Sequence, residues 1–102
     1  MPRLIASSTF QSWIGALKDR RAAARIDDRI VRLQAGNPGD HKSVGSGVSE
    51  LRIHFGPGYR VYYTRRENGD LVILLAGGTK RTQARDIDTA VAIAALENWK
   101  GE

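Results

Sequence analysis

The chain of 102 residues contains no cysteine. That absence excludes a disulfide framework, a thiolate nucleophile and any zinc site with cysteine ligands. Long apolar runs are missing too, because the longest, residues 71–76, is far too short to cross a bilayer as a helix. The first ten residues also lack the apolar stretch of a signal peptide. The sequence therefore predicts a cytoplasmic protein that has no membrane segment.

Lysine is scarce as well, since only four of the 16 basic residues are lysine and the others are arginine. With 11 acidic residues the formal net charge is +5 and the pI is near 10.1. Arginine makes planar, bidentate contacts with phosphate and carboxylate, so the bias favours a nucleic acid or an acidic protein as partner. A net charge of this size also occurs in many ordinary soluble domains. The length predicts one domain over residues 1–102.

Apolar residues spaced three and four positions apart predict two helices in the N-terminal third. Ser8 or Thr9 is placed to cap the first, and the second begins after Asp19 and runs to about Ala35. Four arginines form a stripe on the second helix, which indicates either a partner that neutralises them or a solvated face with local counterions. The apolar residues are Phe10, Trp13, Ile14 and Leu17, then Ala22, Ile26, Ile30 and Leu33; the stripe is Arg21, Arg25, Arg29 and Arg32.

A β-meander is predicted over residues 50–83. Residues 50–55 and 59–65 alternate between apolar and polar side chains, which is typical of half-buried strands, and Gly56-Pro57-Gly58 is a turn signal between them. Pairing Phe55 with Tyr59 across a three-residue turn places Arg60 opposite His54. The same register places Arg52 opposite Tyr62 and Glu50 opposite Thr64 on the polar face.

The dipeptide Asn68-Gly69 predicts the next turn. Both residues accept positive φ, as a two-residue type I′ turn requires, so Glu67 is expected to pair with Asp70. Counting back along the strands places Gly77 opposite Arg60, and the chain leaves the sheet there. Four cationic or titratable groups are then expected to converge, with Arg52 one pair further along: His54, Arg60, Lys80 and Arg81.

The predicted fold class is α+β, with two N-terminal helices, an antiparallel meander and a C-terminal helix. A short strand is expected around residues 43–47, and the third helix is expected to begin between Thr82 and Asp86 and to end near Asn98. The strand that carries Leu71, Ile73 and Leu75 is apolar on both faces. It therefore needs cover on both sides, which the helices can supply.

This order of elements resembles the RelE/ParE superfamily of bacterial toxins, and most of all its HigB-type branch of addiction-module killer proteins. The matching segments cover most of the chain: FQSWIGALKDRRAAARI, GNPGDHKSVGSGVSELRI, GPGYRVYY and LLAGGTKRTQARDI. The resemblance implies a toxin of a type II toxin–antitoxin pair, neutralised by a helix-turn-helix antitoxin. RelE-like members cut mRNA on the ribosome, whereas ParE-like members poison DNA gyrase.

RNA cleavage of this kind needs a base for the 2′-OH, an acid for the leaving oxygen and cations around the phosphate. Arg60 matches the family's Tyr-Arg motif and is the expected phosphate contact, while Lys80 and Arg81 match its basic loop. His54 is the acid–base candidate, because histidine changes charge near neutral pH. The C-terminal tyrosine of some members has no counterpart beside Ile87 or Trp99, and Tyr62 is an imperfect substitute. The expected RNA-binding residues are Arg52, Tyr62, Arg25, Arg29 and Arg32.

Three functions remain open at this point. The first is a ribosome-dependent mRNA endonuclease whose partners are the ribosome, mRNA and a helix-turn-helix antitoxin. The second is a gyrase-poisoning toxin on the same fold, and the third is a basic nucleic-acid-binding module without enzymatic activity. His41 and His54 lack partners at metal-binding spacing, so cleavage is expected to need neither a metal nor another cofactor.

Overall fold

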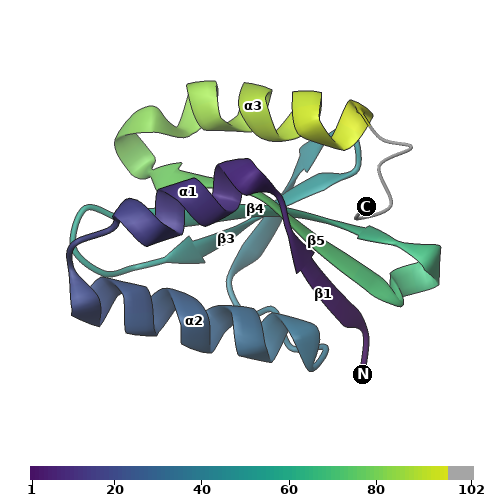
Figure 1. Ribbon diagram of the computed structural model, residues 1–102, viewed down its shortest axis with the longest axis horizontal. Coiled ribbons are helices and arrows are strands. Elements are labelled where there is room, and N and C mark those ends of the chain that lie inside the picture. The colour runs from purple at the N-terminus through teal and green to yellow at the C-terminus, as the bar shows by residue number, and fades with distance from the viewer. Residues whose placement is uncertain (97–102) are drawn as a thin grey trace.

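The computed structural model describes residues 1–96, which form a five-stranded sheet with helices on both faces (Figure 1). This arrangement confirms the predicted α+β class and its order of helices and meander. None of the helices in this range combines the length and apolarity needed to cross a bilayer. In chain order the elements are β1 (Arg3–Ala6), α1 (Ser8–Ala16), α2 (Arg20–Gln34), β2 (His41–Gly45), β3 (Val48–Ile53), β4 (Tyr59–Arg66), β5 (Leu71–Thr79) and α3 (Gln83–Ala95).

The strand order is β1-β5-β4-β3-β2, so β5 has a neighbour on each side. Strands β2 to β5 pair in antiparallel fashion, as the meander predicts, whereas β1 pairs with β5 in parallel, with Arg3 beside Leu71 and Ala6 beside Leu74. Strand β1 was not predicted from the sequence. Four residues are too few to display the alternation of a strand, and the partner lies far along the chain.

The sheet has a separate apolar core on each face. Helices α1 and α2 cover one face, where Ile26 and Leu33 pack against Val61 and Tyr63 of β4. Helix α3 covers the other face. The apolar residues of this second core include Tyr62, Leu71, Ile73, Leu75 and Ala90. The expectation that β5 is covered on both sides is therefore confirmed.

The helix caps agree with the sequence analysis in one case and differ in another. The side chain of Asp19 accepts hydrogen bonds from two backbone N–H groups of the first turn of α2, as predicted. The cap of α1 is Ser7 and neither Ser8 nor Thr9, because its hydroxyl accepts from the Phe10 N–H and donates to the Leu75 carbonyl. Helix α3 ends at Ala95, and the predicted end near Asn98, with Trp99, lies outside the described residues.

The β4–β5 hairpin confirms the predicted turn. Asn68 and Gly69 have φ of 56° and 91°, and the Asp70 N–H donates to the Glu67 carbonyl at 3.0 Å. The register then shifts between Tyr62 and Tyr63, where a bulge adds one residue to β5. Arg60 consequently lies opposite Gly78, one residue beyond the predicted Gly77.

The β3–β4 hairpin corrects the other predicted register. Ile53 pairs with Tyr59, so that a five-residue loop replaces the expected three-residue turn. Every pair shifts by two residues: Glu50 lies opposite Tyr62, and Arg52 lies opposite Arg60. His54 is no longer a strand residue. Two arginines now face each other across the strands, an arrangement that needs compensating carboxylates nearby.

Adjacent glycines at the end of β5 allow one helix to approach each face of the sheet. A Cβ on Gly77 would stand 2.2 Å from the Trp13 ring of α1. A Cβ on Gly78 would stand 1.8 Å from the Asp86 carboxylate of α3. Both distances are far below van der Waals contact, so these two positions accept no side chain without displacing a helix residue.

Candidate active site

A surface depression of about 370 Å³ lies where the β3–β4 loop meets the end of β5. Its lining includes His54, Arg60 and Lys80 together with the turn residues 56–58. The Lys80 backbone N–H donates to the Gly58 carbonyl at 2.7 Å, which fixes the start of the basic loop against the turn. Three of the four groups that were expected to converge are thus brought together. Arg81 is exposed on the neighbouring 3₁₀ turn and does not line the depression.

Arg60 forms the inner wall of this depression and is almost entirely buried, with 7% of its surface exposed. Its nearest acid is Glu50, whose carboxylate lies 3.9 Å from Arg60 Nε and accepts from the Gln83 amide at 3.0 Å. At 3.9 Å the two groups form an ion pair without a hydrogen bond, and Nε has no partner among the described residues. Glu50 was predicted on the polar face opposite Thr64, whereas it is 1% exposed in β3 and pairs with Tyr62.

Tyr62 lies beside this buried pair. The side chain is fully buried, its hydroxyl has no hydrogen-bond partner among the described residues, and burial raises its pKa well above the usual range, with Glu50 and Asp86 adding to the shift. Tyr62 therefore stays a neutral phenol that RNA cannot reach in this structure, which contradicts the predicted RNA contact. Ile87, the other position weighed for the missing tyrosine, packs against the second core.

Asp40 is a site residue that the sequence analysis missed. Its carboxylate accepts from Arg52 at 2.8 Å on one oxygen and contacts His54 Nε2 at 2.5 Å on the other. These hydrogen bonds, first from His54 and then from Arg52, hold the pKa of Asp40 below its ordinary value. Each of the facing arginines thus has its own carboxylate, Asp40 for Arg52 and Glu50 for Arg60.

The contact with Asp40 also fixes the tautomer of His54. An ionised carboxylate only accepts hydrogen bonds, so Nε2 must carry the hydrogen in this contact. In the neutral ring Nδ1 is then the free lone pair, which is the form of a general base oriented by a carboxylate. His54 is well exposed and lines the depression, so this nitrogen is open to solvent.

The arginine stripe on α2 divides into residues with different environments. Arg29 is structural, since its guanidinium donates to the Arg52, Pro38 and Asp40 carbonyls at 2.6, 2.8 and 2.9 Å. Arg32 forms an exposed ion pair with Asp28 one turn away. These two residues match the alternative of a helix face with local partners.

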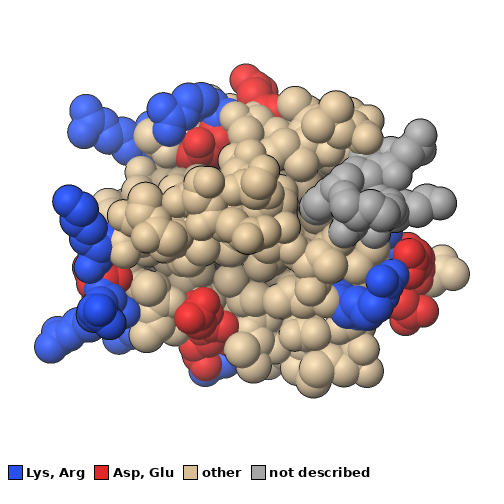
Figure 2. Space-filling model, viewed as in Figure 1, with Lys and Arg blue, Asp and Glu red and all other residues tan. Residues whose placement is uncertain are grey.

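Arg25 lies in the N-terminal half of α2, and its side chain is exposed. Its guanidinium stands 4.8 Å from the centre of the Phe55 ring, and Phe55 also lines the depression that holds His54 and Lys80. In Figure 2 the main group of Lys and Arg side chains lies at the left end of the molecule, where Figure 1 shows the start of α2, the β3–β4 loop and the start of α3. Arg25 therefore belongs to the cationic end of the protein that carries the depression.

Replacing Asp40 by asparagine is expected to reduce stability in a pH-dependent way. Because the folded-state pKa of Asp40 is depressed below 3.8, its ionised form adds stability above that pH, and this contribution is lost as the pH falls through the folded value. Urea unfolding across this pH range should therefore show wild type and Asp40→Asn converging in acid. Asp88→Asn, which makes the same charge change at an exposed position of α3, is the control. A difference in unfolding free energy between wild type and Asp40→Asn that does not vary with pH would contradict the stabilising role of the ionised Asp40 carboxylate.

The family of this protein follows from its sequence match. Residues 12–96 match the family described as phage derived protein Gp49-like. The chain belongs to the Gp49-like family. An uncharacterised protein of Haemophilus influenzae is 57% identical over 86 residues, which make up 84% of this chain and 86% of that protein.

Solved structures identify the fold of this Gp49-like protein. An Arg-to-Ala double mutant of the Escherichia coli toxin RelE in the free state superposes with a TM-score of 0.70, at 15% identity, over 87% of this chain and 93% of that one. The E. coli RelBE toxin–antitoxin complex gives 0.66 at 15% identity, over 78% and 96%. A copper-bound mutant toxin of Helicobacter pylori gives 0.56 at 20% identity, over 79% and 97%. The resemblance to RelE toxins is thereby confirmed for the fold.

Proposed function

We propose that this Gp49-like protein is the toxin of a toxin–antitoxin pair and inhibits translation by cutting mRNA on the ribosome. The observation that carries the proposal is the depression in which His54, Arg60 and Lys80 meet. It supplies two cations and a histidine oriented by a carboxylate, and cleavage by an RNA 2′-OH needs groups of these kinds. The RelE fold supports the proposal, since RelE of the E. coli RelBE complex is a toxin.

Each residue of the depression has a different proposed role in cleavage, which follows from its position. Arg60, held at the inner wall, contacts the scissile phosphate, and Lys80 at the rim stabilises the negative charge that develops on it or protonates the leaving oxygen. His54 takes the proton of the 2′-OH at Nδ1, while Asp40 and Arg52 hold the ring in place. No metal is assigned a role, and residues 1–96 hold no group of three His, Asp or Glu side chains placed to bind one.

RNA outside the depression meets the cationic end of the protein. Arg25 and Arg81 are exposed there, and the Phe55 ring beneath Arg25 offers a surface on which a neighbouring base can stack. The antitoxin partner is a helix-turn-helix protein that neutralises the toxin. That assignment rests on the HigB-type resemblance of the sequence.

Lys80→Gln is expected to reduce mRNA cleavage by about 100-fold, as is usual when one charge-stabilising or proton-donating group is lost. The substitution removes an exposed side chain, so folding should be unchanged. The measurement is transcriptome-wide mapping of new RNA 5′ ends after brief expression at matched protein levels. Arg3→Gln is the control, because it makes the same charge change in β1, which pairs with the far end of β5.

The outcomes separate the candidate functions. New 5′ ends inside translated frames that persist in Arg3→Gln and disappear in Lys80→Gln support the ribosome-dependent nuclease. Growth arrest with intact mRNA and induced DNA damage rejects it in favour of a gyrase poison. If wild type neither arrests growth nor cuts RNA but binds nucleic acid with a steep dependence on salt, the chain is a binding module.

A further inference from the structure

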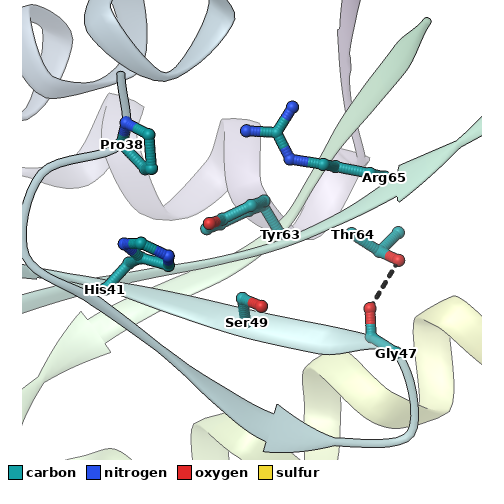
Figure 3. Close-up of a pocket in the computed structure, with 7 residues that line it drawn as sticks. All are labelled: Pro38, His41, Gly47, Ser49, Tyr63, Thr64 and Arg65. Carbon is teal, nitrogen blue, oxygen red and sulfur yellow. Dashed lines mark hydrogen bonds between the residues drawn. The ribbon is translucent and has the colours of Figure 1, made fainter. Parts of the chain in front are cut away.

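A second depression, of about 260 Å³, lies toward the other end of the β3–β4 hairpin from His54 and Lys80 (Figure 3). Its walls come from five segments: Pro38 in the loop after α2, His41 in β2, Gly47 in the β2–β3 turn, Ser49 in β3, and Tyr63, Thr64 and Arg65 in β4. Figure 3 shows these side chains around one opening, with the Arg65 guanidinium turned back over Tyr63 toward Pro38. No carboxylate is among the described residues that line it.

Arg65 belongs to the arginines that have no acidic partner in the described residues. Arg3, Arg32, Arg52, Arg60 and Arg85 each have an acidic partner within 4 Å. Within residues 1–96, Arg65 has no such partner, and its guanidinium lies 6.0 Å from the Tyr63 ring centre instead. An exposed guanidinium that faces a hollow without carboxylates leaves its N–H donors available to an anion.

Two hydroxyls of the hollow, those of Tyr63 and Ser49, are also hydrogen-bond donors. Burial raises the pKa of Tyr63, with Arg65 and Ser49 opposing the shift, so the phenol keeps its O–H at neutral pH. Ser49 pairs with Tyr63 across the strands and adds a second hydroxyl on the same face. His41 Nδ1 lies 2.7 Å from the Gly39 carbonyl, so it carries the hydrogen of that bond, and the neutral ring borders the hollow without adding a free donor.

Arg29 holds the opposite wall in place. Its guanidinium donates to the Pro38 and Asp40 carbonyls, which fixes the loop that carries Pro38 and leads into His41. Its charge also acts on the Tyr63 phenol, where it lowers the pKa against the effect of burial. One wall of the hollow is therefore held by hydrogen bonds, and the positive charges of Arg29 and Arg65 lie close to it.

From this donor set we propose that the hollow binds a phosphate group. A guanidinium fork and hydroxyls on neighbouring strands approach from different directions, which suits a tetrahedral anion with several oxygens better than a planar carboxylate. The volume is below that of pockets that enclose a drug-sized ligand, so the site takes the phosphate and leaves any attached group outside. The phosphate comes either from an RNA backbone or from a small phosphate.

The first arm of the test uses inorganic phosphate and the full-length protein. Nuclear magnetic resonance should show saturable shifts of the Arg65 Nε–H and of the Ser49 and His41 amides, with sodium chloride of equal ionic strength as the reference. Arg65→Gln should weaken binding at least about tenfold, whereas Arg65→Lys, which keeps the charge without the fork, should weaken it less. Equal binding by wild type and Arg65→Gln, or shifts that do not saturate, would overturn the proposal.

The second arm identifies the source of the phosphate with a single-stranded 2′-O-methyl RNA, which has no 2′-OH to attack. If a backbone phosphate occupies the hollow, Arg65→Gln lowers the slope of log affinity against log salt by about 0.7, while Arg3→Gln leaves it unchanged. An unchanged slope combined with saturable phosphate binding assigns the site to a small phosphate. Neither readout depends on cleavage, so the site can be present even if the proposed nuclease activity is absent.

Discussion

Alanine at Gly77 is expected to lower the free energy of unfolding by about 3 kcal/mol, the upper part of the range for overpacking a core. The new Cβ would lie 2.2 Å from Trp13, and that ring is itself packed against Phe10 and Tyr59 with centroids 5.8 and 6.4 Å away. The indole cannot move aside without disturbing both neighbours, so α1 must shift away from the sheet. Chemical denaturation followed by tryptophan fluorescence measures the loss.

Gly15→Ala is the matched control for that substitution. Gly15 lies inside α1, and a Cβ there would have no atom within 4 Å. Because alanine restricts the unfolded chain and favours helix, this change is expected to stabilise the protein by about 0.5 to 1 kcal/mol. Equal effects at the two glycines would show that the clash at Gly77 is relieved at little cost.

Glu50→Ala is expected to destabilise the protein by about 3 to 5 kcal/mol, the usual cost of leaving a buried charge without its partner. Glu50 and Arg60 are 1% and 7% exposed, and the remaining guanidinium would have no acid beside it in the described structure. Arg60→Met should destabilise for the mirror-image reason, since it leaves Glu50 buried with only the Gln83 amide. Urea unfolding of both variants tests the expectation.

Replacing the pair together separates folding from activity. Glu50→Leu combined with Arg60→Met removes both charges, so the double variant is expected to unfold within about 1 to 2 kcal/mol of wild type. It should nevertheless cut no mRNA, because the proposed phosphate contact is gone. A double variant that folds and still cleaves would reject the role of Arg60 while leaving the description of the buried pair intact.

The hydrophobic pattern predicted the faces of the strands correctly but not every register. A slip of one residue exchanges the two faces of a strand, which the pattern forbids, whereas a slip of two residues preserves them. The β3–β4 hairpin differs from its predicted pairing by two residues, so Ile53 and Val61 stay on the apolar face although they no longer pair. The β4–β5 hairpin was predicted correctly near its turn, because Asn68-Gly69 fixes the loop length.

The basic residues of the candidate site were identified from the sequence, whereas the contacts of its acidic residues were not. Arg60 lies at the start of β4, just after the turn of residues 56–58, and Lys80 follows the last residue of β5, so turn and strand signals in the sequence locate both. Asp40 follows a loop and reaches His54 only once the chain has turned back through β2 and β3, so no local spacing reveals the contact. The bulge after Tyr62, which sets Arg60 against Gly78, likewise has no signal of its own.

The parallel pairing of β1 with β5 has a consequence for the timing of folding during synthesis. Ala6 ends the first strand to be made, but its partner strand begins at Leu71. At roughly 5 to 20 residues per second, about 3 to 13 s of translation separate the two. During that time β1 has no partner strand with which to form the edge of the sheet. Lys80 is synthesised after β5. The sheet edge formed by β1, and the depression lined by Lys80, can therefore be completed only after β5 has been synthesised.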